Sequence, residues 1–132
     1  MATGDSGDFT GLAGVSLFTS AERFEVMRDF YVEQVGLTPD PSKAPTREAF
    51  TWGTPPTRVR LILSTHDEVS GPSTEPNRVM VNLLTPNLEA VARGMAERGV
   101  VFTHGPMSMP WGGMMATFRD PDGNTMQLLQ PA

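Results

Sequence analysis

Cysteine is absent from the 132-residue sequence, so a disulfide framework and any thiolate nucleophile, redox site or zinc site are excluded. Long apolar runs are absent too, because no stretch approaches the roughly 20 residues that span a bilayer. The first dozen residues are small and acidic, unlike the basic and apolar start of a secretory signal. We therefore expect a cytoplasmic protein that does not contact a membrane.

Positive charge is also scarce. Ten basic residues stand against fifteen acidic ones, for a net charge of −5, and no Lys/Arg cluster is present that would neutralise a run of phosphates. Nucleic acid is therefore not expected as a partner. A chain of this length with 39% hydrophobic residues can form one compact core, so residues 1–132 are expected to be a single domain.

The first half of the chain predicts a strand, a helix and two further strands. Residues 14–19 alternate and are rich in β-formers, and a helix with Ser20 as its N-cap and Gly36 as its stop follows. Residues 48–53 and 57–65 then read as two strands joined by a proline-containing turn. The apolar stripe of the helix comprises Phe24, Met27, Tyr31 and Val35.

The second half repeats this order after a polar linker at residues 66–77, which is the best candidate for a mobile segment. A strand at 78–85, a helix capped by Asn87, a short strand at 100–102, a loop containing His104 and two strands around the turn DPDGN are predicted. LFTSAERF at 17–24 aligns with LLTPNLEAV at 83–91, so a tandem duplication is inferred, with modules at about 12–65 and 78–131.

The turn DPDGN is interpreted as a hairpin turn without a chemical role. Asp120 can cap its own turn, Pro121 fixes φ, and Gly123 or Asn124 accepts a positive φ.

Two segments, VSLFTSAERFEVMRDFYVEQVGL and PWGGMMATFRDPDGNTMQLLQP, carry a resemblance that extends over nearly the whole chain. They resemble the vicinal-oxygen-chelate superfamily of glyoxalases, extradiol dioxygenases and bleomycin-resistance proteins. The resemblance implies an α+β fold in which two tandem βαβββ modules form a cupped mixed sheet with the helices on its convex side. It also implies a ligand inside the cup and a homodimer whose partner chain completes it.

In metal-using members of the superfamily, the resemblance places ligands at the positions of Gly14, Met80 and Gln127. Glycine offers no ligand, a thioether suits soft copper(I), and an amide is a weak neutral donor. Neither His66 in the linker nor His104 in its loop is expected to compensate, so no metal and no cofactor are predicted. Gln127 either bonds a bound molecule or satisfies a neighbouring strand residue, and both readings stay open.

Strand alternation in the phase of Gln127 predicts which side chains face into the cup. Met115 and Thr117 are expected to face inward, whereas Phe118 and Leu128 pack under the helices. The other inward positions are Ser16, Phe18, Asn82, Leu84 and Leu129.

A glycine-rich segment, MSMPWGG, is expected at the lip of the cup, and Trp52 ends a strand nearby. Methionine adapts to irregular apolar ligands and tryptophan offers a stacking surface, so a large, partly planar organic molecule is expected. Met27, Met95 and Met126 are expected to fill the core instead. Arg60 either forms a salt bridge across the sheet or binds a ligand carboxylate or phenolate.

These patterns favour a metal-free antibiotic-binding protein over an enzyme. It would sequester an aromatic or polycyclic natural product, enediyne-, quinone- or bleomycin-like, without altering it; bleomycin itself is less favoured because it is cationic. The alternative is a lyase, isomerase or oxygenase of the glyoxalase or dioxygenase type with an unrecognised metal site, and no catalytic residue is assigned. The predicted ligand-binding residues are Phe18, Trp52, Arg60, Met80, Asn82, His104, Met107, Met109, Trp111, Met115 and Gln127.

Overall fold

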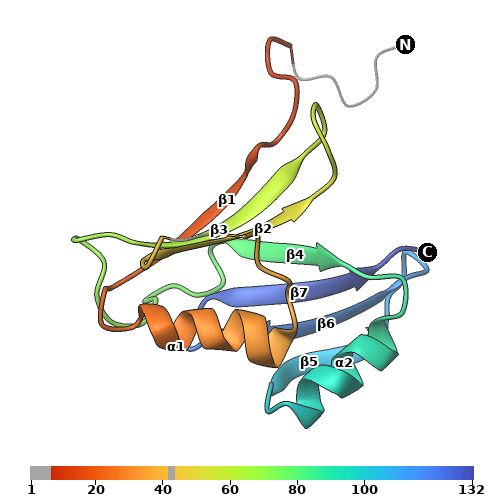
Figure 1. Cartoon of the computed structure of the whole chain (residues 1–132). Coiled ribbons are helices and arrows are strands. Elements are labelled where there is room, and N and C mark those ends of the chain that lie inside the picture. The colour runs from red at the N-terminus through yellow and green to blue at the C-terminus, as the bar shows by residue number, and fades with distance from the viewer. Residues whose placement is uncertain (1–6, 42–43) are drawn as a thin grey trace.

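The computed structural model describes residues 7–41 and 44–132. The first module consists of β1 (Gly14–Thr19), α1 (Phe24–Asp29), a π-helix η1 (Phe30–Val35), β2 (Arg47–Trp52) and β3 (Val59–Thr65). The second consists of β4 (Met80–Leu84), α2 (Leu88–Glu97), β5 (Phe102–Ser108), β6 (Met114–Arg119) and β7 (Thr125–Gln130) (Figure 1). No helix in these ranges is long and apolar enough to cross a bilayer.

Each module has its own sheet, with strand orders β1-β3-β2 and β4-β7-β6-β5. In both sheets the first strand of the module pairs in parallel with the last, and the remaining pairs are antiparallel. This confirms the predicted α+β fold of two repeated modules. The first sheet has one strand fewer than the second, and the segment before β2 contains Pro39, Pro41 and Pro45, which lack the N–H that a central strand donates.

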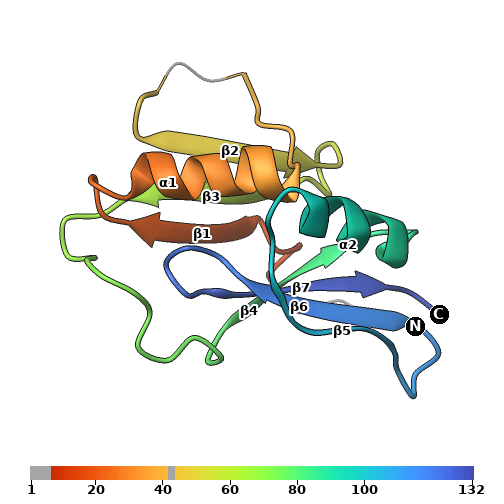
Figure 2. The same cartoon turned by 90° about the horizontal axis from the view of Figure 1, so that it is seen from below.

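A single apolar core joins the modules. α1 runs alongside the first sheet and contacts β3, while α2 contacts β5, β6 and β7 (Figure 2). The predicted helix stripe is buried, and the helix ends at Gly36 with a φ of 93°, both as predicted. The helix itself begins at Phe24, later than expected from Ser20. The buried core includes Phe24, Met27, Phe30, Tyr31, Phe50, Leu61, Leu63, Leu88, Met95, Phe118, Met126 and Leu128.

The DPDGN turn does more than connect two strands. The Tyr31 hydroxyl on η1 donates to Asp120 Oδ2 at 2.6 Å, and the Thr19 hydroxyl at the end of β1 donates to Asp122 Oδ2 at 2.5 Å. Arg23 Nε donates to Asp122 Oδ1 at 2.8 Å. Both aspartates are buried, so the turn joins the two modules through charge-assisted hydrogen bonds.

Burial sets the protonation behaviour of this junction. Desolvation raises the pKa of the Asp120 carboxyl above its usual value, although hydrogen bonds from Tyr31 and Asn124 act in the opposite direction. Desolvation, reinforced by the nearby Asp120 charge, raises the pKa of the Tyr31 hydroxyl well above its usual value. Gly123 takes a φ of 82°, as the turn interpretation requires.

Arg98 forms a second junction between the modules. Its Nε donates to the carbonyl of Gln34 at 2.9 Å and its Nη2 donates to the carbonyl of Val35 at 3.3 Å. These carbonyls end the π-helix and have no partner within it, so a cation beside them is favourable.

Candidate ligand-binding site

Four polar side chains form one row across the second sheet. Asn82 on β4 lies beside Gln127 on β7, Gln127 lies opposite Thr117 on β6, and Thr117 lies opposite His104 on β5. On β6 and β7 the residues that alternate with the row are buried in the core; they are Ala116, Phe118, Met126 and Leu128. The polar row therefore lies on the sheet face that turns away from the core.

An apolar row runs beside the polar row on the same face. Leu84, Leu129, Met115 and Met107 are neighbours across the four strands in the same register. Leu84 is 76% exposed and Met107 is 42% exposed, so this row is uncovered in the single chain. The face thus presents neutral hydrogen-bonding groups next to a strip of adaptable apolar side chains.

Most of the polar row has unused hydrogen-bonding capacity. Gln127 Nε2 donates to the Thr117 hydroxyl at 3.4 Å, and that hydroxyl donates to the Met115 sulfur at 3.3 Å. The amide nitrogen therefore satisfies a neighbouring strand residue, which is one of the two predicted readings, while the amide carbonyl stays available. Among the described residues, no hydrogen bond engages the side chains of Asn82 and His104.

His104 was expected in a loop, and this was wrong. It belongs to β5, which continues to Ser108 through two register shifts between Phe102 and Met107. Gly105 takes a φ of 70° within this irregular stretch, so the glycine and proline of THGP are accommodated by a bulged strand.

The positions that resemblance assigned to metal ligands do not fit a divalent ion. At Gly14 an added Cβ would stand 2.1 Å from the carbonyl oxygen of Arg60, so no side chain can be present there. Met80 pairs with Thr125, and the strand neighbour of Gln127 is Asn82, so these two positions offer only a thioether and amides. Within residues 7–41 and 44–132, no three His, Asp or Glu are grouped as a metal site.

The corresponding face of the first sheet carries Phe18 and Arg60. Phe18 lies in the row with Ser64 on β3 and Arg47 on β2 and meets the ring of His66 edge-on at 5.6 Å. Arg60 Nε donates to the hydroxyl of Thr51 at 3.2 Å and lies 3.9 Å from a carboxylate oxygen of Asp40. Arg60 therefore forms an ion pair, but with Asp40 in the segment before β2 and not with a carboxylate across the sheet.

A tight turn between β5 and β6 carries the predicted lip residues. The Met109 amide donates to the Gly113 carbonyl at 2.9 Å, and the Gly112 amide donates to the Met109 carbonyl at 3.0 Å. The half-exposed ring of Trp111 occupies the space that a side chain at Gly113 would need, because an added Cβ would lie 1.9 Å from its Cζ3. Gly113 thus provides the room in which Trp111 packs.

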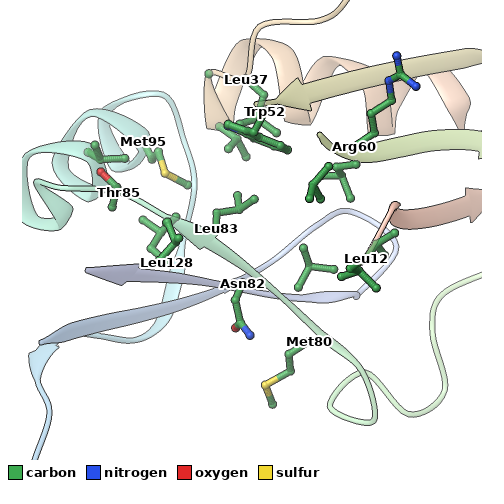
Figure 3. Close-up of a pocket in the computed structure, with 18 residues that line it drawn as sticks. Leu12, Leu37, Trp52, Arg60, Met80, Asn82, Leu83, Thr85, Met95 and Leu128 are labelled. Atoms are coloured by element: carbon green, nitrogen blue, oxygen red, sulfur yellow. The ribbon is translucent and has the colours of Figure 1, made fainter. Parts of the chain in front are cut away.

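A cleft of about 680 Å³ lies between the modules, within the size range of small-molecule pockets. Trp52 and Leu37 line it from the first module, and Leu83 projects into it from β4 (Figure 3). Met80 and Asn82 also belong to its lining, although their side chains extend from β4 to the side opposite Leu83. Trp52 has the phase of the buried Phe50. It therefore faces this cleft and not the surface that carries Gln127.

The predicted residues thus occupy four places in the structure. Met80, Asn82, His104, Met107, Met115 and Gln127 share the outer face of the second sheet, Phe18 and Arg60 lie on the first, and Met109 and Trp111 lie in the turn between β5 and β6. Trp52 lines the cleft, and the lining of the cleft also includes Arg60, Met80 and Asn82. Leu37, Leu83, Val91 and Met95, which also line the cleft, were not predicted, because the cleft exists only once the two modules have packed together.

The tandem modules, each with its first strand parallel to its last, define an α+β protein of the duplicated-module type. Residues 19–128 match the model of the Glyoxalase/Bleomycin resistance protein/Dioxygenase superfamily, and the chain belongs to this superfamily. Among curated proteins none matches the sequence.

Solved structures show the same fold over nearly the full length. The chain is similar to TnmS3, an antibiotic binding protein from Streptomyces sp. CB03234, with 27% identity, a TM-score of 0.67, and coverage of 95% of this chain and 98% of that one. A superfamily member from Sphaerobacter thermophilus DSM 20745 is 25% identical, with a TM-score of 0.63 and coverage of 92% and 98%. A glyoxalase/bleomycin resistance protein from Catenulispora acidiphila DSM 44928 is 20% identical, with a TM-score of 0.69 and coverage of 93% and 100%.

Proposed function

We propose that this protein binds an aromatic or polycyclic natural product and sequesters it without altering it, as a self-resistance protein would. The observation that carries the proposal is the outer face of the second sheet, where a neutral polar row lies beside an apolar row. Ligand sites combine a mainly apolar surface with a few placed polar groups, and this face has that composition. Similarity to an antibiotic binding protein supports the same reading.

Neutral donors in the polar row favour binding over metal-assisted catalysis. Asn82, Gln127 and Thr117 stand side by side across three strands, and His104 is the one imidazole in the row, whereas a divalent ion would need several carboxylate or imidazole ligands. The superfamily also includes glyoxalases and dioxygenases, so the test must detect chemical change of the ligand as well as its binding.

We further propose that the working form is a homodimer in which a second copy covers the exposed faces. In the part of the chain that the structure describes, β1 and β4 each pair with one strand only, so each leaves one edge open. Phe9, Leu12, Val79 and Leu84 near these edges are 69% to 77% exposed. Open edges and clustered exposed apolar residues are features that a partner chain covers.

Titration of the purified protein with a panel of aromatic antibiotics tests the binding claim, with tryptophan quenching as the signal and mass spectrometry of the recovered drug as the chemical check. Submicromolar binding with the drug mass unchanged is expected. A product of altered mass, formed with or without added divalent metal, would establish an enzyme instead. Sedimentation at the same concentrations is expected to give the mass of two chains.

A matched pair of variants locates the site. Met107→Thr removes an exposed member of the apolar row, and it should weaken binding roughly tenfold because burying a methionine contributes about 1.5 kcal/mol. Val26→Thr makes a similar change on the outer surface of α1, where the side chain is 49% exposed, and should leave affinity unchanged. Equal effects of the two substitutions would place the ligand elsewhere.

A further inference from the structure

The strand residues that face away from the core carry an uneven distribution of charge. Arg47, Arg60 and Arg119 lie on these faces, and no Asp or Glu does. Glu48 is the one carboxylate within the seven strands described, and it has the opposite phase and accepts from Arg28 at 3.0 Å. The chain as a whole carries a net charge of −5, so these faces are positive in an acidic protein.

Arg119 is the arginine best placed to contact a ligand. It lies two residues beyond Thr117 on β6, so it has the same phase as the polar row and lies roughly 7 Å farther along the strand. Its strand neighbour is Thr125, and among the described residues no ion pair or hydrogen bond engages its side chain. Arg60, by contrast, is held by Thr51 and lies near Asp40.

We infer that the ligand carries no positive charge and presents an oxygen-rich edge of carbonyl and hydroxyl or phenolate groups to the polar row and to Arg119. The amides of Asn82 and Gln127 can donate to and accept from such an edge, and the guanidinium favours an oxygen that bears negative charge. The ring system then lies on Met115 and Met107. This inference rests on the proposed function and specifies the chemical class of the ligand.

Two planar dyes of similar three-ring size test the charge preference by calorimetry at neutral pH. Alizarin presents carbonyl and hydroxyl oxygens on an anthraquinone, whereas proflavine is a cation without oxygens. Alizarin is expected to bind at least about tenfold more tightly, and its affinity is expected to fall with added salt.

Charge variants identify the group responsible. Arg119→Gln should weaken the binding of alizarin about three- to tenfold and reduce the salt dependence of that binding. Arg119→Glu should shift the binding preference toward proflavine. Arg93→Gln, the same substitution at an exposed position of α2, should leave the affinity for both dyes unchanged. Circular dichroism of each variant confirms folding, and Arg119→Lys, which keeps the positive charge and should keep the preference for alizarin, provides a second test if the other Arg119 variants fail to fold.

The outcomes separate this inference from the proposed function. Tight binding of proflavine, or an alizarin affinity that is insensitive to Arg119→Gln and Arg119→Glu, would overturn the charge preference while an aromatic-binding role still stood. Absence of binding by both dyes and by the antibiotic panel would overturn the proposed function and the inference together.

Discussion

Replacing Tyr31 by phenylalanine removes a single hydroxyl from the junction between the modules. That hydroxyl is fully buried and donates to Asp120 Oδ2 at 2.6 Å. Asp120 keeps its bonds from the backbone amides of Asp122 and Asn124 and from the Asn124 side chain. A hydrogen bond to a charged group contributes about 1.5–3 kcal/mol, so we expect a loss of this size and a fall in Tm of roughly 5–15 °C.

The pH dependence of this loss has a definite sign. The pKa of Asp120 is raised in the folded protein, so its stabilising contribution is present below the ordinary aspartate value near 4 and is lost as pH rises through the folded-state pKa. The Tyr31 bond lowers that pKa, and its removal raises the pKa further. The variant should therefore lose more stability at pH 7 than at pH 4.

Urea unfolding at pH 4 and pH 7, followed by circular dichroism, measures both quantities. Asp120→Asn and the double variant with Tyr31→Phe complete a cycle that isolates the coupling between the two side chains. A loss below about 0.5 kcal/mol, or equal losses at the two pH values, would refute the role given to this bond.

Two further substitutions test the packing. Gly14→Ala places a Cβ against the Arg60 carbonyl and should disrupt β1–β3 pairing, with a lower Tm or no soluble protein. Gly11→Ala, where no atom lies within 4 Å of an added Cβ, should leave the Tm unchanged, and an unchanged Tm in both variants would contradict the close approach at Gly14. Arg98→Met should lower the free energy of unfolding in urea by about 1–2 kcal/mol, because two hydrogen bonds to carbonyls are lost. Arg93→Met should lower it little, and equal losses in the two variants would argue against the contact of Arg98 with the helix end.

Local pattern was enough to predict the faces of the second sheet. Period-two alternation placed Phe118 and Leu128 on the core face and Thr117 and Gln127 on the opposite face, because each of these strands packs one face against the helices. Helical spacing likewise predicted the buried stripe of α1 and the Asn87 cap of α2, whose side chain accepts from the Ala90 amide.

Features that depend on the packing of one module on the other were missed. Asp120 and Asp122 in the turn bond to Tyr31 and Thr19, which lie about 90 and 100 residues earlier, so no local pattern connects them. Trp52 was placed with the lip residues because its sequence neighbours suggested a strand end, but the phase of β2 turns it into the cleft.

Two departures from regular strand geometry also could not be predicted from the sequence. Gly14 looked like the loss of a metal ligand, yet the close approach of the Arg60 carbonyl requires a residue without a side chain there. His104 precedes a glycine and a proline, which usually break a strand, and only the bulged pairing of β5 with β6 places it in the polar row.

Native mass spectrometry of the protein mixed with an aromatic antibiotic tests the central claim most directly. It reports the number of chains in the complex, the number of drug molecules bound and the mass of each. We predict two chains carrying drug of unchanged mass, and weaker occupancy for Met107→Thr than for Val26→Thr. A chain that binds no drug, or a bound species whose mass differs from that of the added drug, would contradict sequestration.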